Sequence, residues 1–299
     1  LQTDDGGSGD LALAFTGNGT VTFDTAKVSI GELDTLALSS DSDLTLNFGD
    51  LFGGDADDDL ESISYSGSGN LDIDATLFNA TSLETFDASE ASGVVDNDAV
   101  DLNAGAAQGI TLSGGSGNDV LDGTAQKDTI SGGAGNDTIE GLGGADTLTG
   151  GSGIDTFKIA TAGEAGTSGD ETITDFDASA TGDELALAPG VVRGDKTSTD
   201  VNTDVSGASD LNASITNGVI SLSGDDVGEV DTVTEFAAIF RTLDGDDSTA
   251  NMAAFELDGD TFVITDVAGD TNSDIVELSG VTGIVGVSTT NADDTIFVS

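Results

Sequence analysis

Short runs in which apolar and polar residues alternate fill the first third of the chain. Leu44, Leu46 and Phe48 lie two residues apart, as do Leu71 and Ile73. A period of two is typical of strands that bury one face. Gly, Ser, Asn and Asp separate these runs and mark turns between them. The pattern predicts strands at 11–15, 20–23, 44–48 and 70–74.

A weak repeat accompanies these strands. The pattern Leu-acid-hydroxyl-apolar occurs at 33–36, 60–63 and 83–86, at intervals of 27 and 23 residues. Intervals of roughly 20–50 residues are typical of solenoids, in which each coil buries its apolar face against its neighbours. Chance similarity among short strands of an acidic, Thr-rich chain is the alternative. We expect a β-solenoid of irregular coils over residues 1–113.

A stricter pattern begins at Gly114, where the sequence runs in units of nine residues without a gap. The units are GGSGNDVLD, GTAQKDTIS, GGAGNDTIE, GLGGADTLT and GGSGIDTFK. The sixth position is always aspartate: Asp119, Asp128, Asp137, Asp146 and Asp155. The eighth is always apolar: Leu121, Ile130, Ile139, Leu148 and Phe157. A flexible Gly-Asp linker is the alternative, but a linker has no need of a regular apolar position.

The nine-residue spacing predicts a turn followed by a short strand in each unit. Glycine tolerates the conformations of tight turns and leaves backbone carbonyls accessible, and the eighth side chain points inward. Two units then form one coil, with a turn on each side. Units on the same side stack, so Asp119, Asp137 and Asp155 should line one edge, and Asp128 and Asp146 the other.

Aspartate carboxylates and backbone carbonyls should converge between the stacked turns. Calcium accepts roughly 6–8 oxygen ligands in a flexible geometry, whereas magnesium demands a tighter octahedron. Without an ion, stacked carboxylates would repel each other. We therefore expect several calcium ions that act as folding ligands. The expected ligands are the five aspartates and the carbonyls of Gly114, Gly117, Gly132, Gly135, Gly150 and Gly153.

Two units depart from the glycine pattern. The second has Thr124, Gln126 and Lys127, and the fourth has Leu142 in place of its second glycine. We therefore expect weaker binding at the edge formed by Asp128 and Asp146.

Two further acidic segments lie outside the array. The segment GGDADDDLE at 53–61 matches the nonapeptide once, with Asp58 at the sixth position, and could hold one ion. Asp266, Asp270 and Asp274 form an acidic loop that lacks the spacing of an EF-hand. A solvated acidic turn is the alternative in both cases.

The remaining residues, 159–299, are less regular. Phe236, Ile239, Phe240 and Leu243 fall at the spacing of one helical face and predict a helix near 234–244, with Thr234 as its N-cap. Predicted strands lie at 218–222, 261–265, 274–278 and 295–298.

Composition narrows the classes of function. The chain has 57 acidic and 6 basic residues, with a formal net charge of −51. It cannot present the basic patch that nucleic acids or anionic membranes require, and no apolar run is long enough to insert as a helix. The absence of His and Cys excludes Ser-His-Asp triads, thiolate nucleophiles, disulfides and the zinc sites built on those residues.

The array resembles the RTX family of bacterial exoproteins secreted by type I machinery. Segments 171–177, 183–187, 259–266 and 274–281 are similar to regions that follow such arrays, and 293–299 resembles a C-terminal secretion signal. The irregular coils are similar to those of RTX-type surface-layer proteins. The resemblance implies an all-β, right-handed parallel β-solenoid or β-roll. It implies secretion of an unfolded chain that folds extracellularly on binding calcium.

We expect three regions: the solenoid at 1–113, the calcium-binding β-roll at 114–158 and a β-rich region with the secretion signal at 159–299. The favoured function is a structural subunit of a bacterial surface layer or filament, assembled as a calcium-bridged homo-oligomer or lattice, with cell-surface polysaccharide as a further partner. A fragment of an RTX adhesin or biofilm matrix protein is the alternative.

An enzyme with an RTX tail is disfavoured. The family's proteases and lipases need His, which is absent, and sugar hydrolases favour aromatic platforms, whereas this chain has no Trp and one Tyr, Tyr65. A lyase would need a basic residue, and Arg193 and Arg241 both lie outside the expected solenoid. We expect no enzymatic activity.

Overall fold

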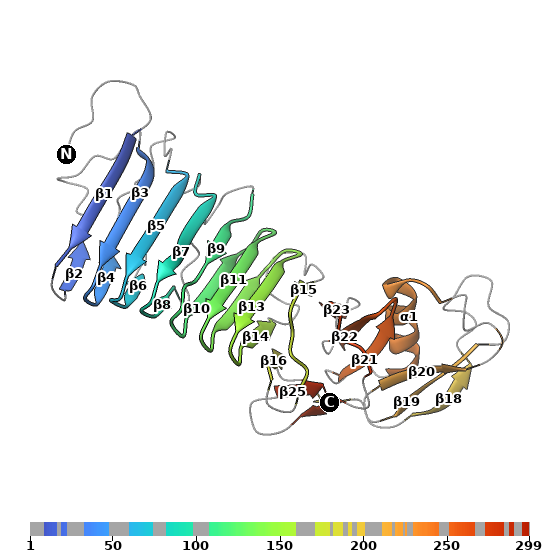
Figure 1. The fold of residues 1–299 in the computed structure, drawn as a ribbon. Helices are drawn as coiled ribbons and strands as arrows, with labels where there is room; N and C mark the ends of the chain where they lie inside the picture. The colour runs from blue at the N-terminus through green and yellow to red at the C-terminus, as the bar shows by residue number, and fades with distance from the viewer. Residues whose placement is uncertain are drawn as a thin grey trace. The chain divides into compact units, whose positions relative to one another are not determined.

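The chain divides into two compact units, Leu1–Phe157 and Lys158–Ser299, in a computed structural model (Figure 1). The structure describes residues 9–16, 19–22, 33–47, 60–73, 82–97, 108–159, 171–179, 182–187, 191–192, 196–200, 211–216, 219–223, 225, 230–244, 251–266, 273–283, 287–289 and 295–298.

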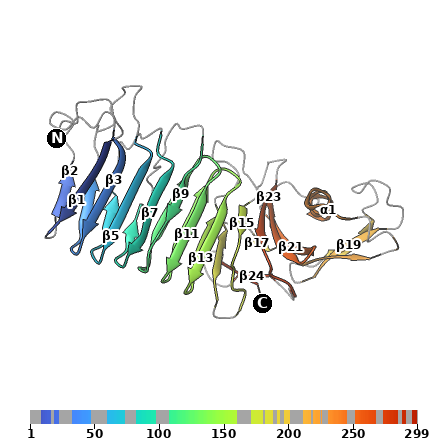
Figure 2. The same ribbon diagram turned by 45° about the horizontal axis from the view of Figure 1, so that its top comes forward.

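The first unit is a solenoid whose successive strands alternate between two sheets (Figures 1 and 2). One sheet contains β1 (Gly9–Phe15), β3 (Leu33–Ser40), β5 (Ser62–Gly67), β7 (Thr85–Ala91), β9 (Thr111–Ser113), β11 (Thr129–Ala134) and β13 (Thr147–Ser152). The other contains β2 (Gly19–Thr22), β4 (Leu44–Asn47), β6 (Leu71–Ile73), β8 (Val95–Asp96), β10 (Val120–Thr124), β12 (Thr138–Leu142) and β14 (Thr156–Ile159). Neighbouring strands run parallel from β1 to β13 and from β2 to β12. The prediction of an all-β parallel solenoid is confirmed.

One inward row of side chains runs through both kinds of coil. The row consists of Leu36, Ile63, Phe86, Leu112, Ile130 and Leu148, which pair in register along the first sheet and are all at most 2% exposed. The last residue of the weak repeat and the eighth position of the nonapeptide are therefore the same position of the coil. The sheets pass residue 114 without a break, while the interval between row members changes from 27, 23 and 26 residues to 18.

The coils share one tight turn, which no regular spacing in the sequence predicted upstream of the array. A Cβ added to Gly93, Gly117 or Gly135 would collide with the backbone carbonyl of Gly69, Gly93 or Gly117, respectively. The same relation joins Gly69 to Ser42 and Gly153 to Gly135. Only glycine permits such a close approach between backbones. The repeated close approach shows that the stacked turn of the nonapeptide already begins upstream, at residue 42, and continues to residue 153.

The described residues of the second unit form mixed sheets, with antiparallel and parallel strand pairs, and one helix. One sheet contains β15 (Glu171–Ile173), β23 (Ser273–Leu278), β22 (Asp260–Asp266), β21 (Asn251–Leu257), β20 (Val219–Ser223), β19 (Asn212–Thr216) and β18 (Lys196–Asp200), and β17 (Val191–Val192) pairs with β21. Strands β16 (Glu184–Leu187), β25 (Thr295–Val298) and β24 (Val287–Thr289) lie in the other. The four strands predicted in this region correspond to β20, β22, β23 and β25.

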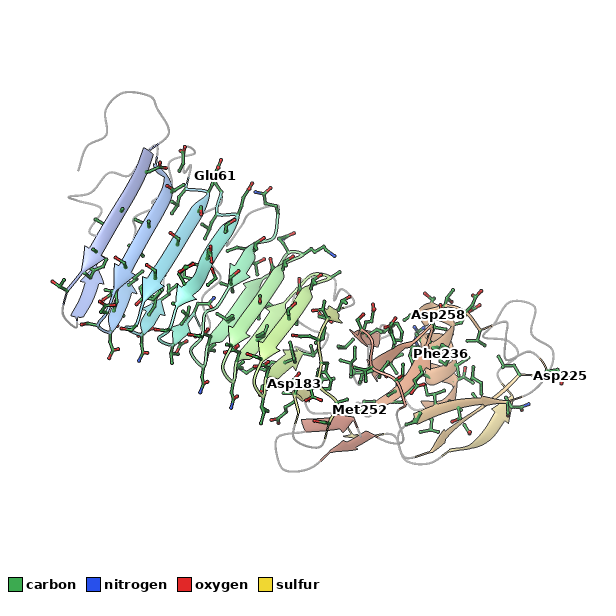
Figure 3. All side chains as sticks on the ribbon, viewed as in Figure 1. Glu61, Asp183, Asp225, Phe236, Met252 and Asp258 are labelled. Carbon is green, nitrogen blue, oxygen red and sulfur yellow. The ribbon has the colours of Figure 1, made fainter. Side chains whose placement is uncertain are left out.

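Helix α1 (Val233–Asp244) covers the core of the second unit and confirms the predicted helix. Phe236, labelled in Figure 3, stacks on Phe255 of β21 with 4.0 Å between the ring centroids. The predicted N-cap, Thr234, is wrong. Thr232 caps the helix: Glu235 N donates to Thr232 Oγ1 (3.3 Å), and Thr232 N donates to Glu235 Oε2 (3.2 Å). This reciprocal capping box requires a glutamate or glutamine three residues after the cap. Thr232 has Glu235 at that position, whereas Thr234 has Ala237.

No helix within these described ranges is long and apolar enough to cross a membrane.

Replacing Gly93 by alanine should destabilise the solenoid by about 1–3 kcal/mol, because the new methyl group would overlap the Gly69 carbonyl in a packed turn. Urea denaturation monitored by circular dichroism measures the change. Ser92→Ala is the matched control, because Ser92 is an exposed neighbour in the same turn. Equal stability of the two variants would contradict the close stacking.

Candidate metal centre: two rows of buried aspartates

The five aspartates of the array form two rows, one at each edge of the solenoid, and each is 1% exposed. At one edge, Asp119 N donates to Asp137 Oδ1 (2.8 Å), and Asp137 N donates to Asp155 Oδ1 (2.9 Å). At the other, Asp128 N donates to Asp146 Oδ1 (2.8 Å). These bonds join residues one coil apart, which is the arrangement that the nine-residue repeat predicts.

The first glycine of each unit leaves space beside the aspartate. A Cβ on Gly132 would meet Asp137 Oδ2 and would lie 2.7 Å from the carbonyl oxygen of Gly150, in the next coil. At the other edge, a Cβ on Gly123 would lie 2.6 Å from both Asp128 Oδ2 and the Gly141 carbonyl oxygen. A carboxylate oxygen and a carbonyl oxygen from the adjacent coil therefore border the same small space.

In the coils upstream of the array, apolar side chains occupy the equivalent positions. Asp119 is level with Val95, since Val95 N donates to Asp119 Oδ1 (2.8 Å), and Val95 pairs in register with Leu71. The first-glycine position, two residues beyond the inward row, is occupied by Leu38 and Tyr65, which pair with each other. These four side chains are buried. In the upstream coils, apolar groups therefore fill the two positions that glycine and aspartate occupy in the array.

Tyr65 also supplies a hydroxyl group to the upstream turn. Its Oη lies 2.9 Å from the carbonyl oxygen of Gly69 and 3.4 Å from that of Ser40, and donates to this pair of acceptors. Burial, followed by the nearby charges of Asp43 and Asp41, raises the pKa of Tyr65, which keeps the hydroxyl protonated as a donor. At this turn a protein side chain therefore satisfies the buried carbonyls.

Within the two aspartate rows, two carboxylate oxygens have no such donor. Asp137 Oδ2 and Asp146 Oδ2 are buried without a hydrogen-bond partner. Burial raises the pKa of Asp137 to about 6, and the charges of Asp119 and Asp155 add to this effect. Burial likewise raises the pKa of Asp146 to about 7, with a further contribution from Asp128 and a smaller opposing one from Lys127. A buried ionised oxygen without a partner is costly, so both positions favour a cation.

The donor set fits calcium. The described residues contain no group of three or more carboxylates that could hold a metal ion by themselves. A site here would combine one or two aspartates with backbone carbonyls, and calcium is the common ion that accepts such an all-oxygen, partly neutral set.

A family model for the RTX calcium-binding nonapeptide repeat (4 copies) matches residues 111–137 and 122–157. The protein carries an RTX calcium-binding array. RTX repeats of this kind bind calcium ions, as the repeat predicts. No protein in the curated set matches the chain.

The structure places the other predicted ligands, inside and outside the RTX array, as follows. Gly117 and Gly135 lie in the stacked turn, where the carbonyl oxygen of each closely approaches the glycine of the next coil. Asp266 and Asp274 pair with Ser273 and Thr265, respectively, in strands β22 and β23. Asp58 and Asp270 lie outside the described residues.

A row of exposed amides, which the repeat did not predict, lies beside the aspartates. Asn136 N donates to Asn118 Oδ1 (2.8 Å), and Ile154 N donates to Asn136 Oδ1 (3.0 Å). The row resumes upstream, where Val94 N donates to Asn70 Oδ1 (2.9 Å). Asparagine at the fifth position of two RTX units was the available signal.

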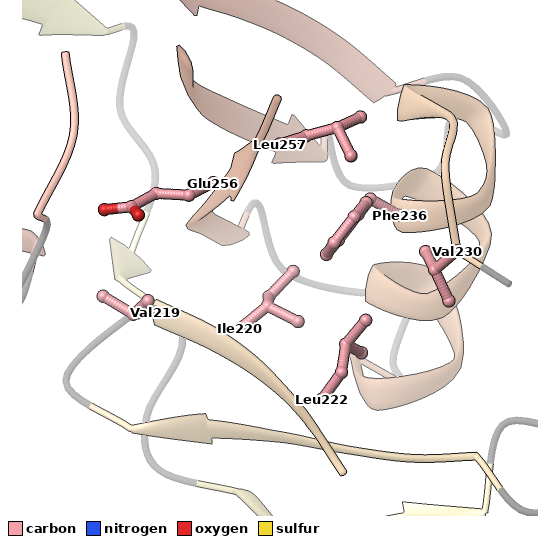
Figure 4. A pocket seen from close by; sticks show the side chains of 7 residues that line it. All are labelled: Val219, Ile220, Leu222, Val230, Phe236, Glu256 and Leu257. Atoms are coloured by element: carbon pink, nitrogen blue, oxygen red, sulfur yellow. The ribbon is translucent and has the colours of Figure 1, made fainter. Parts of the chain in front are cut away.

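The second unit has a cavity of about 370 Å³ between α1 and the sheet, shown in Figure 4. Its lining is apolar except for Glu256, whose Oε1 accepts a bond from Gly283 N (2.5 Å). Binding sites usually bring several polar groups together, so this cavity is a weaker candidate than the RTX array.

Without calcium, the RTX array should lose stability as the pH rises from about 4 through 6 and 7. Unfolded aspartates titrate near pH 4, whereas Asp137 and Asp146 titrate at about 6 and 7 in the fold. In this range the folded chain binds more protons than the unfolded chain, so raising the pH favours unfolding. Melting temperatures in calcium-free buffer test this, with the double variant Asp137→Asn/Asp146→Asn as control. If the variant shows the same pH dependence, these two residues are not its source.

Removing calcium should unfold residues 114–158 but leave Tyr65 buried, because protein groups fill the turn around that residue. Tyr65 is the only tyrosine and the chain has no tryptophan, so its fluorescence reports on the upstream coils alone. Acrylamide quenching in chelator should stay well below that of the chain in guanidinium, while circular dichroism shows loss of β-structure. Quenching as strong in chelator as in denaturant would contradict the prediction, as would unchanged circular dichroism.

Proposed function

We propose that this protein is a calcium-dependent structural protein of the bacterial cell surface, a subunit of a surface layer or extracellular filament. The observation that carries the proposal is the pair of buried aspartate rows within a continuous solenoid. Their carboxylates make folding of the RTX array depend on a cation, and the solenoid around them has the regular, extended architecture of a scaffold.

The residues of the RTX array have different roles in the proposed folding. Bound calcium would supply the positive charge that the buried carboxylates of Asp137 and Asp146 lack. Asp137 and Asp146 orient their Oδ1 atoms through the backbone amides of the preceding coil and leave Oδ2 toward the site. The first glycines keep the site clear of side chains, and the inward row excludes water from the interior of the coil.

The outer face of the first sheet supports assembly. Thr35, Ser62, Thr85, Thr111, Thr129 and Thr147 pair in register along it. Hydroxyl groups both donate and accept hydrogen bonds, so identical faces can pair with each other. In a chain of charge −51, an uncharged row also lets two copies approach with less repulsion.

The proposed location is extracellular, after export by a type I apparatus. RTX repeats are typical of secreted proteins, and extracellular calcium reaches the ~10⁻⁴–10⁻³ M range in which extracellular modules bind. The proposed role is structural and not catalytic, which agrees with the absence of His and Cys from the sequence.

Purified protein should form sheets or filaments when millimolar calcium is added, because bound ions reduce the repulsion between copies and order the RTX array. Light scattering and electron microscopy measure assembly, with magnesium at the same concentration as the ion control. Asp137→Asn/Asp146→Asn should stay dispersed. A chain that folds with calcium, judged by circular dichroism, yet stays monomeric would reject the lattice and favour the adhesin fragment.

A further inference from the structure

The aspartates of the array form two classes that cut across the two edges. Asp119 Oδ2 accepts a bond from Gly115 N (2.8 Å), and Asp128 Oδ2 accepts one from Thr124 N (2.6 Å). In each case the donor is the second residue of the aspartate's own unit. The Oδ2 atoms of Asp137 and Asp146 have no donor and are buried. Asp119 and Asp137, which lie on one edge, thus differ in class, as do Asp128 and Asp146 on the other.

The backbone at the second position differs between the classes. In the units of Asp137 and Asp146, that position has positive φ, 110° at Gly133 and 66° at Leu142. Gly115 and Thr124 do not have positive φ. In the units of Asp119 and Asp128, the backbone amide of the second residue donates to the aspartate carboxylate. In the units of Asp137 and Asp146, the amide at that position makes no bond to Oδ2.

Leu142 is unusual because residues other than glycine rarely adopt positive φ. The turn around Asp146 keeps this conformation although the residue is not glycine. A residue held in an unfavourable backbone region is a reason to look for function. Here the conformation accompanies a carboxylate oxygen that no protein donor occupies.

Thr124 has the opposite effect on Asp128. Its Oγ1 lies 3.0 Å from both carboxylate oxygens, and Ile110 N donates to Oδ1 (2.7 Å). Thr124 is 1% exposed, so water does not compete for these bonds. Donors around the carboxylate place positive hydrogens where a cation would have to bind. A β-branched threonine also resists the change to positive φ that would remove its amide.

We propose that the backbone conformation of the second residue of a nonapeptide decides whether its aspartate binds calcium, so that Asp146, beside Leu142 at positive φ, is a calcium ligand, whereas Thr124 keeps Asp128 from binding. The inference rests on the RTX calcium function and sharpens it. Leu142, not the edge on which the aspartate lies, then determines binding at Asp146. Asp137, with Gly133 at the second position, belongs to the binding class.

Calcium stoichiometry of the full chain, measured by isothermal titration calorimetry and native mass spectrometry, tests the proposal. Asp146→Asn should bind at least one ion fewer than the wild type. Asp128→Asn, the matched control from the same edge, should bind the wild-type number. Thr124→Gly should bind one more ion, because it removes the hydroxyl donor and allows positive φ.

Loss of the same number of ions from Asp128→Asn and Asp146→Asn would overturn the proposal, as would an unchanged count in Thr124→Gly. If Asp128→Asn does not fold, Thr124→Gly still decides, because it leaves every aspartate in place. A wild-type chain that binds no calcium would instead reject the RTX function itself. Failure to assemble despite these counts would reject only the proposed lattice.

Discussion

The burial of carboxylate oxygens at the coil edges is the constraint on which the array depends. The interior of a solenoid has to be filled at every coil, because each coil buries its core only against its neighbours. Upstream, Leu71, Val95 and Tyr65 fill the edge positions with groups that need no ion. In the array, glycine and aspartate leave a polar space instead, and Asp137 Oδ2 and Asp146 Oδ2 lack a protein donor within it. We therefore expect one architecture to contain a part that folds without an ion and a part that needs one.

The two parts share a frame because their turns are the same. Close approach at Gly93 and Gly117 stacks the last upstream turns on the first turn of the array. Asp119 stands at this junction, with Oδ1 bonded to Val95 of the upstream coil and Oδ2 to Gly115 of its own turn. An upstream part that keeps its structure without calcium would offer the array a preformed edge, which avoids the cost of forming a first coil afresh.

Charge has a second role beyond the metal site. The five aspartates of the rows are a small part of the 57 acidic residues. The rest keep the chain highly negative even where the array binds ions, so the proposed association of copies would depend on faces with little charge. The hydroxyl row from Thr35 to Thr147 is such a face. The exposed carboxylate of Asp87, two residues after Thr85 in the same strand, places a negative charge next to this row.

The sequence by itself determined the features that repeat at a fixed interval. Five aspartates and five apolar residues spaced by nine predicted the buried apolar positions of the array, both aspartate rows and calcium as the ion, and the spacing of Phe236 and Leu243 predicted the helix. The tertiary structure decided the rest. The shared turn was hidden because upstream coils differ in length, so Gly93 and Gly117 meet only once the coils are stacked. The capping role of Thr232, the hydroxyl bond of Tyr65 and the two classes of aspartate likewise depend on which donor reaches which oxygen, and the register between coils fixes that choice, not the spacing along the chain.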